Sequence, residues 1–437
     1  MDNRLIAIED KALDALESKF VNLSEEDRFA LLKRTLLSIE SKITDGEINE
    51  IYTDIINLGK IDNFLRMSNI EDIMINNTKS TFVYDSKSGY VRVTDADFDS
   101  EGLDRVVKKL KLYSTNQIAD GNILDVHMDG GSRANIVSSP KGYNVTIRNF
   151  SNKPLSILDL INLGELDYKI AARLWLYLDG FRIRPANILI GGIAASGKTT
   201  LLNSMLSFFR PDLRLVTIEE TYQLNTEIFE NSVNLETNEN MSLEDLIKAA
   251  MRMRADAIVV GEVRGAEAKD MLSVMNIGKM SISTIHASSA RDVINRLSHS
   301  PMNVPEDIIP VIDAIVMLSR VHTRSGMNRR VVQVSEISGR ETQILLSDLY
   351  RYDYKTGKST DILPSVSYRD TISKAIGVEP SDIVAEERLR SVILSTLNEL
   401  GKRSIAEISD SVQEYYDEPE NLLNRIGLKD ASPIIRI

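Results

Sequence analysis

The chain has no cysteine among its 437 residues, so neither a disulfide framework nor a cysteine-based zinc site is possible. It also lacks long apolar runs. The two longest, 188–195 and 308–318, fall short of the roughly 20 residues that a membrane-spanning helix needs. The first ten residues include Glu9 and Asp10 and contain no apolar signal-peptide core. We expect a soluble, cytoplasmic protein that associates with a membrane only through partners.

Basic residues are in the minority, with 52 lysines and arginines against 64 acidic residues and a net charge of −12. A dedicated nucleic-acid-binding protein would show the opposite balance on at least one face. We therefore expect no direct nucleic-acid partner. The four histidines show no metal-ligand spacing.

The length predicts two to three domains. Changes in pattern along the chain divide it into four regions, with a linker expected at 151–163. In the third region strands alternate with helices, which predicts an α/β domain with a largely parallel sheet and a smaller antiparallel part near its end. The expected regions are a helical N-terminal region at 1–62, an α+β domain at 63–152, the α/β domain at 153–366 and a helical C-terminal region at 367–437.

The segment Gly192–Thr199 satisfies the phosphate-loop pattern G-x-x-x-x-G-K-[ST]. It follows an apolar stretch expected to be a strand and opens an expected helix, as the pattern requires. Backbone N–H groups of such a loop cradle phosphate oxygens, and the helix adds its positive N-terminal end. Lys198 would place a charge between the β- and γ-phosphates, and Thr199 would offer a hydroxyl to Mg²⁺. The residues expected to bind nucleotide are Gly192, Ala194, Ala195, Ser196, Gly197, Lys198, Thr199 and Thr200.

Acidic residues end two further apolar runs downstream of this loop. Glu262 follows Ala257–Gly261, as a Walker B acid does, and would hold Mg²⁺ through water or orient the attacking water. Glu219 and Glu220 follow a second such run. In open parallel sheets ligands gather at the carboxyl ends of the strands, so two acid-ended strands beside one phosphate loop favour a catalytic site. Considered alone, each of these acids could instead be an ordinary solvent-exposed residue at the end of a strand.

Three other residues carry side chains suited to phosphate chemistry. His286 ends a fourth expected strand, where it would sense the γ-phosphate, bridge to a neighbouring subunit or simply complete a tight turn. Arg133 and Arg148 lie in the preceding α+β domain. An arginine fork suits phosphate oxygens, although the pattern alone does not separate these two from ordinary surface arginines.

Taken together, these motifs resemble the type II/type IV secretion ATPase superfamily, most closely its CpaF-like branch, which drives Tad/Flp pili and archaeal type IV pilus systems. The segments that carry the resemblance include Ile70–Asn76, Asp129–Asn135, Thr146–Arg148, Thr217–Thr221, Met251–Gly265 and Ser283–Ala287.

The resemblance implies a RecA-like P-loop ATPase domain in a homo-hexameric ring that uses ATP and Mg²⁺. It implies that Arg133 and Arg148 approach the phosphates and that Lys198, Glu219, Glu220, Glu262 and His286 complete the catalytic set. A polytopic membrane platform protein would be the direct partner, and pilin or a secreted substrate the indirect one.

The chain departs from the family pattern at three places. Gln223 stands where the family has a glutamate thought to act as general base, and glutamine can orient water but cannot accept its proton. Asn276–Lys279 stands where an additional histidine is expected. Ala195 replaces a loop glycine, which we expect to be tolerated if its φ is negative.

Three functions remain open at this point. The leading one is an ATP-hydrolysing motor for pilus assembly or secretion. The second is an ATP-binding assembly or regulatory subunit with little turnover, for which Gln223 is the reason. The third is a conjugation-type secretion ATPase.

Overall fold

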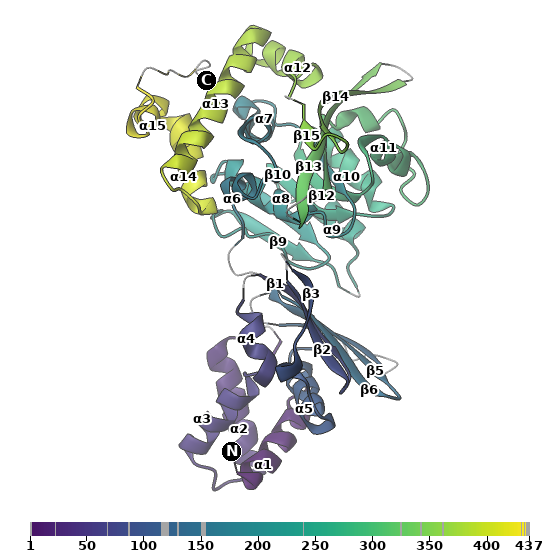
Figure 1. Ribbon diagram of the computed structural model, residues 1–437, viewed down its shortest axis with the longest axis vertical. Helices are drawn as coiled ribbons and strands as arrows, with labels where there is room; N and C mark the ends of the chain where they lie inside the picture. Colours follow the sequence, from purple (N-terminus) through teal and green to yellow (C-terminus); the bar gives the residue numbers. More distant parts are fainter. Residues whose placement is uncertain are drawn as a thin grey trace. The chain divides into compact units, whose positions relative to one another are not determined.

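The computed structural model describes residues 2–21, 23–67, 69–85, 88–114, 122–128, 131–149, 154–238, 240–323, 326–340, 343–360, 362–429, 431 and 433. The chain divides into two compact units, Met1–Lys153 and Pro154–Ile437 (Figure 1). Each unit contains two hydrophobic cores of its own. The finer division into four regions remains a prediction.

Apolar residues at three- and four-residue steps produce the helices that begin the first unit, as predicted. Ser24 and Thr44 cap two of them by accepting from backbone N–H groups three residues on. Leu13, Phe20 and Leu36 are buried in one shared core. The helices are α1 (Asn3–Ala15), α2 (Glu25–Ile39), α3 (Asp45–Ile55) and α4 (Asp62–Leu65), with a 3₁₀ turn η1 (Gly59–Ile61).

A six-stranded antiparallel sheet forms the rest of the first unit, in the order β3-β2-β1-β6-β5-β4. Helix α5 (Ser100–Lys111) covers it, since Leu103, Val107 and Leu110 lie on one helical face and share a core with the strands. The edge strand β4 was not predicted. The elements are β1 (Ile70–Asn76), β2 (Ser80–Asp85), β3 (Gly89–Arg92), η2 (Thr94–Ala96), β4 (Ile123–His127), β5 (Arg133–Ser139) and β6 (Gly142–Arg148).

The second unit is built on a nine-stranded mixed sheet in the order β15-β14-β13-β12-β7-β11-β10-β8-β9. The strands from β12 to β9 in this order run parallel, and β13, β14 and β15 extend the sheet antiparallel. The α/β fold class is confirmed. The strands are β7 (Ile188–Gly192), β8 (Leu215–Glu219), β9 (Ser232–Glu236), β10 (Ala257–Val263), β11 (Met280–His286), β12 (Ala314–Thr323), β13 (Gly326–Arg340), β14 (Gln343–Asp353) and β15 (Lys358–Ser359).

Helices cover both faces of this sheet, because successive strand residues point to opposite sides. Ile188 and Ile190 share one core with α6, α7 and α8, whereas Leu189 shares the other with α9, α10 and α11 (Figure 1). The helices are α6 (Ile157–Asn162), α7 (Tyr168–Asp179), α8 (Lys198–Met205), α9 (Leu243–Ala250), α10 (Glu267–Asn276) and α11 (Ala290–Ser298), with 3₁₀ turns η4 (Gly180–Arg182), η5 (Leu206–Phe208) and η6 (Ile309–Val311).

The expected linker at 151–163 is wrong over its second half. Helix α6 lies there, and Ser156 and Asp159 cap it reciprocally. Ile157, Leu158 and Leu160 are buried in the main core. Residues 151–153 lie outside the described part of the chain.

The C-terminal region is helical, as predicted, and packs on the α7 side of the sheet. Glu336 of β13 ties it there by accepting from Val366 N at 2.9 Å and Ser367 N at 2.8 Å, at the start of the first C-terminal helix. The helices are α12 (Ser367–Ile376), α13 (Pro380–Glu399), α14 (Ile405–Asp417) and α15 (Pro419–Arg425).

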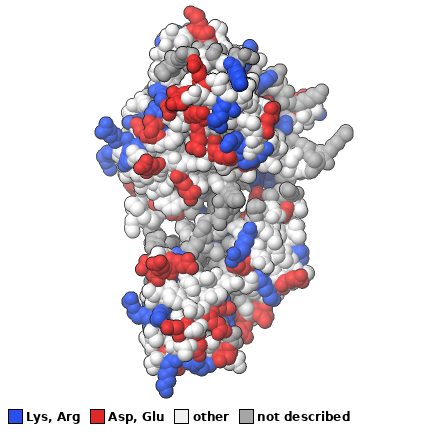
Figure 2. Space-filling view, turned by 90° about the vertical axis from the view of Figure 1, so that its left-hand side faces the viewer, with Lys and Arg blue, Asp and Glu red and all other residues white. Residues whose placement is uncertain are grey.

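No helix within the described ranges is long and apolar enough to cross a bilayer. On the face shown in Figure 2, positive and negative side chains are interspersed over both units. That distribution agrees with the acidic composition and shows no broad basic area on this face.

Candidate functional site

The phosphate loop connects the end of β7 to the start of α8, in the second unit. Gly197 precedes the helix with φ of 96°, a conformation that side chains rarely adopt. Because α8 begins at Lys198, the N–H groups of its first turn have no carbonyl acceptor within the helix. The loop therefore presents donors and a positive helix end at one point.

Ala195 departs from the expectation of a negative φ. Its φ is 58°, in the left-handed region where a Cβ approaches the following carbonyl oxygen and costs roughly 1–2 kcal/mol. The loop thus keeps the backbone that a glycine would adopt freely, and the alanine is strained. Such local strain is common at ligand-binding loops.

Lys198 is buried to 8% exposure, with its ammonium 3.4 Å from the carbonyl oxygen of Ile193 and 3.8 Å from Oε1 of Glu262. Burial lowers the pKa of Lys198 below its ordinary value, while Glu262 opposes that effect. Ser196 Oγ is also buried and has no hydrogen-bond partner among the described residues. A buried cation and an unpaired buried hydroxyl in one loop need an acceptor-rich ligand.

The sheet order explains why residues distant in sequence meet here. Strands β7, β11, β10 and β8 are parallel neighbours, so their carboxyl ends share one edge. Lys198 follows β7, His286 ends β11, Glu262 lies near the end of β10 and Glu219 ends β8. The structure brings these four sequence-predicted residues to a single edge.

Glu262 is the acid that faces the phosphate loop. A register shift at Gly261 interrupts the pairing of β10 with β11 and redirects the residue that follows. A Cβ on Gly261 would lie 3.1 Å from Cγ of Glu219, so that position favours glycine. Glu262 Oε1 lies 3.0 Å from Nε2 of His286, and its side chain is 17% exposed.

Burial and the charge of Lys198 lower the pKa of His286, and Glu262 partly offsets them. The ring nitrogen Nε2 lies 3.0 Å from the Glu262 carboxylate, so the two groups are in contact. His286 thus bridges the carboxylate of β10 to the edge that carries the phosphate loop. This contact favours a site role over a simple turn residue.

Arg264 lies within the segment Met251–Gly265 that carries the resemblance, but the sequence pattern predicts no role for it. Its guanidinium contacts Glu262 Oε2 at 2.6 Å and Glu220 Oε2 at 2.9 Å, joining the two predicted acids. Glu267 accepts from the backbone N–H groups of Arg264 and Gly265, which fixes the turn. The i, i+2 spacing from Glu262 on an extended strand was the available signal.

Glu219 is buried and engaged by its own loop. Its two carboxylate oxygens accept from Gln223 N at 3.0 Å and from Leu224 N at 3.4 Å. Glu219 therefore shapes the loop that carries Gln223. Glu220 is exposed and paired with Arg264.

Arg133 and Arg148 lie in the first unit and are direct register partners on β5 and β6. Like charges directly opposite on a sheet are destabilising, so this pair favours a role other than folding. Asp72 of β1 lies 4.0 Å from Arg148 and offsets part of the repulsion. Asp129 and Gly130, which begin the predicted motif around Arg133, lie outside the described residues.

The residues of the second unit fit a nucleoside triphosphate with Mg²⁺. Unpaired Ser196 Oγ, buried Lys198 and the open N-terminus of α8 suit phosphate oxygens. No group of three or more metal-ligating side chains lies together among the described residues.

Comparisons with known proteins show the family to which the chain belongs. The family described as Type II/IV secretion system protein matches residues 100–346, more than half of the chain. An uncharacterized protein of Methanocaldococcus jannaschii is 30% identical over 84% of this chain and 68% of its own length. The conjugal transfer protein TrbB of Rhizobium radiobacter is 37% identical over 35% of this chain and 49% of that protein.

Among solved structures, the ATPase DotB of Legionella pneumophila aligns with this chain at a TM-score of 0.48 and 18% sequence identity. The alignment covers 75% of this chain and 85% of the DotB chain. The extent of the family match and the identity to the Methanocaldococcus protein decide the assignment. The chain belongs to the Type II/IV secretion system protein family, whose ATPase members bind nucleotide.

Proposed function

We propose that the chain is an ATP-hydrolysing motor of the CpaF-like branch, a homo-hexamer that powers pilus assembly or protein secretion through a polytopic membrane platform protein. The observation that carries the proposal is the shared edge of β7, β11 and β10, where buried Lys198, His286 and Glu262 converge. A protein that only binds a nucleotide needs the phosphate loop but does not need Glu262 and His286 beside it. The motor would be cytoplasmic and reach the membrane through its partner.

The chain's residues take distinct roles in this proposal. Lys198 and the loop N–H groups bind the β- and γ-phosphates, and Thr199 with Glu262, through water, holds Mg²⁺. In the hexamer, Arg133 and Arg148 add a paired positive charge for the triphosphate. Bound Mg²⁺ would neutralise charge on the phosphate oxygens.

Hydrolysis requires that the attacking water lose a proton as its oxygen bonds to the γ-phosphorus and the bond to the ADP oxygen breaks. Gln223 orients that water without taking its proton. Glu219, Glu220 and Glu262 are the carboxylates that could take that proton: Glu219 accepts from two backbone N–H groups, and Glu220 and Glu262 pair with Arg264.

The test is steady-state phosphate release by the full chain with Mg²⁺, combined with a mass measurement of the assembled state. We expect turnover in a six-fold assembly and a loss of at least about 100-fold on Lys198→Ala, since phosphate charge loses its buried partner. Lys248→Ala, which removes a surface lysine paired with Glu244, is the matched control. If the assembled protein released no phosphate in the presence of ATP and Mg²⁺, the proposed motor function would be wrong.

Gln223 favours a second function, an ATP-binding assembly or regulatory subunit with little turnover. Gln223→Glu distinguishes the two: a large gain in rate favours this damped site, whereas an unchanged rate points to another base. Gln223→Met, which keeps the length but cannot orient water, is the control and should lower any existing turnover.

The match to TrbB favours a third function, a conjugation-type secretion ATPase. Genes beside the coding sequence separate it from the pilus motor. Pilin and platform genes would support the pilus motor, and coupling-protein genes would support conjugation.

A further inference from the structure

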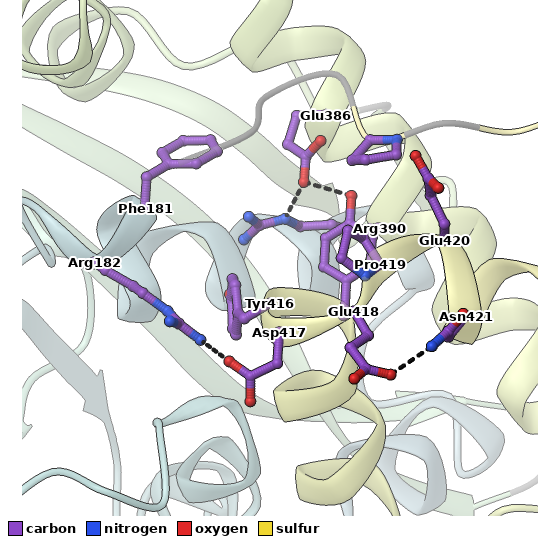
Figure 3. A pocket seen from close by; sticks show the side chains of 12 residues that line it. Phe181, Arg182, Glu386, Arg390, Tyr416, Asp417, Glu418, Pro419, Glu420 and Asn421 are labelled. Atoms are coloured by element: carbon purple, nitrogen blue, oxygen red, sulfur yellow. Dashed lines mark hydrogen bonds and ion pairs between the residues drawn. The ribbon is translucent and has the colours of Figure 1, made fainter.

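A cavity of about 410 Å³ lies in the second unit, away from the phosphate loop's edge, and no predicted role accounts for it. One wall is the turn after α7, and the other is formed by α13, α14 and α15 (Figure 3). The acidic and aromatic run Tyr415–Glu420 forms most of the second wall.

The buried cation at the floor of the cavity is paired with carboxylates. Arg390 is buried to 1% exposure and paired with both Asp179 and Glu386. The rings of Trp175, Phe181 and Tyr416 lie 5.0–5.8 Å from its guanidinium carbon. Arg390 therefore needs no anionic ligand, and its guanidinium lies beside the three aromatic rings.

The rim carries an excess of negative charge. Arg182 is its one described cation and pairs with Asp417 at 2.9 Å. Glu418 and Glu420 add two further carboxylates beside that pair, and Glu418 accepts from Asn421 (Figure 3). Phosphates and other anions are disfavoured here, and a cation is favoured.

Arg182 shows how a guanidinium fits this surface. Its charged group lies 5.0 Å from the ring centroid of Tyr416 while it pairs with Asp417. Gly180, Phe181 and Arg182 hold consecutive left-handed φ angles of 48°, 53° and 60°. Asp179 accepts from Phe181 N at 2.7 Å and fixes this turn, so the wall is rigid.

We propose that this cavity, which we call the C-terminal pocket, binds a lysine or arginine side chain from a cytoplasmic segment of the membrane partner. The negative rim and the aromatic wall suit a cation, as Arg182 demonstrates. Cytoplasmic loops of membrane proteins are rich in lysine and arginine, which makes such a segment the complementary occupant. The identity of the partner rests on the proposed function; the cation site itself does not.

The pocket is connected to the phosphate-loop helix by aromatic packing. Helix α8 continues into η5, where the ring of Phe208 stacks on Trp175 at 5.7 Å with an interplanar angle of 6°. Trp175 Nε1 donates to Tyr416 Oη at 2.7 Å, on the pocket wall. We infer that occupancy of the pocket and of the nucleotide site influence each other along this path.

Trp175 is the only tryptophan in the sequence, so its fluorescence reports on the pocket wall directly. The probe is a capped pentapeptide of alternating glycine and arginine, titrated into the full chain without nucleotide. We expect a saturable change that weakens as salt rises. The same peptide with glutamine for arginine should give none. Equal responses to both peptides, or no response to either by fluorescence or calorimetry, would overturn the site.

Variants separate the pocket from general electrostatics. Glu418→Gln combined with Glu420→Gln should weaken the arginine peptide about tenfold, since two rim carboxylates are neutralised. Glu399→Gln with Asp410→Asn removes the same charge from α13 and α14 outside the pocket and should change affinity less than twofold. Equal weakening by both pairs would show non-specific attraction and overturn the proposal.

The coupling is tested by repeating the titration with Mg²⁺ and a saturating non-hydrolysable ATP analogue, so that binding stays at equilibrium. Affinity for the peptide should shift at least threefold, and the peptide should shift affinity for the analogue by the same factor. Tyr416→Phe removes the acceptor of Trp175 Nε1 and should reduce that shift while binding persists. An unshifted affinity overturns the coupling. These binding measurements do not depend on hydrolysis. Absence of turnover would therefore contradict the proposed motor function without deciding whether the pocket binds the peptide.

Discussion

The ammonium of Lys198 lies 3.8 Å from Glu262 Oε1, so the cation of the phosphate loop faces the acid of β10. Arg264 and His286 contact the same carboxylate at 2.6 Å and 3.0 Å. Glu262 is thus surrounded by three basic groups. Arg264 and His286 lie outside the phosphate loop, so their contacts position the acid independently of Lys198.

Arg264→Ala should lower turnover about 10- to 100-fold, because Glu262 and Glu220 lose the group that joins them. Nucleotide affinity should change less than about threefold, since Lys198 and the loop are untouched. Phosphate release and binding of a fluorescent nucleotide measure the two. Arg66→Ala, which removes an exposed arginine paired with Asp62 on α4, is the control. A loss of affinity as large as that of Lys198→Ala would contradict a positioning role.

Ala195→Gly should stabilise the chain by about 0.5–1 kcal/mol. Relief of the left-handed strain is offset in part by the greater freedom of glycine in the unfolded chain. Ala194, whose φ is outside the left-handed region, supplies the control: Ala194→Gly should destabilise by a similar amount. Thermal unfolding measures both. Shifts of the same sign would show that the φ of Ala195 is not the cause.

The chemistry-bearing loop and the strand-ending acids were predictable, because each depends on a local pattern with a known physical requirement. The convergence of these residues at one edge was not predictable, because the strand order β7-β11-β10-β8 depends on pairing between segments that are distant in the sequence. Helix α7 was missed because all residues from Ile170 to Asp179 are buried, which removes the one-sided periodicity that marks a helix. Arg264 was missed because its partners come from two strands.

The engagement of Glu219 was likewise out of reach of the sequence. As an acid at a strand end it resembled Glu262, yet its oxygens accept from the backbone of its own loop. Only the path of residues after β8 decides this. The left-handed φ of Ala195 is a similar case, because the loop's closure overrides the preference of the residue.

Glu336→Gln should destabilise the second unit by about 2–4 kcal/mol. The buried carboxylate accepts from Tyr177 Oη and from three successive N–H groups at the start of α12, and an amide would turn a donor toward them. Urea unfolding followed by Trp175 fluorescence reports on this unit. Glu399→Gln, exposed at the end of α13, should stay within about 0.5 kcal/mol. If Glu399→Gln lowered the free energy of unfolding as much as Glu336→Gln, the hydrogen bonds of Glu336 would not be what anchors α12.

Stability of the first unit should fall as pH rises through neutrality. Burial, reinforced by Asp54, raises the pKa of Glu9 to about 7, while Arg105 opposes the shift. Glu9 has no exposed side-chain surface, and Arg105, Asp54 and Lys109 are the charged groups of its cluster.

Because the folded pKa of Glu9 exceeds the unfolded one, its contribution is complete below about pH 4.5 and is lost as pH rises through 7, on the order of 3 kcal/mol. Asp54, whose pKa is lowered by Lys109 against its own burial, acts in the opposite direction and only in acid. Hydrogen exchange of α1 and α5 should therefore quicken between pH 5 and pH 8, after correction for the intrinsic rate. Glu9→Gln should remove that dependence, and Glu26→Gln on the exposed face of α2 should keep it. A dependence that survives Glu9→Gln would assign the titration to another group.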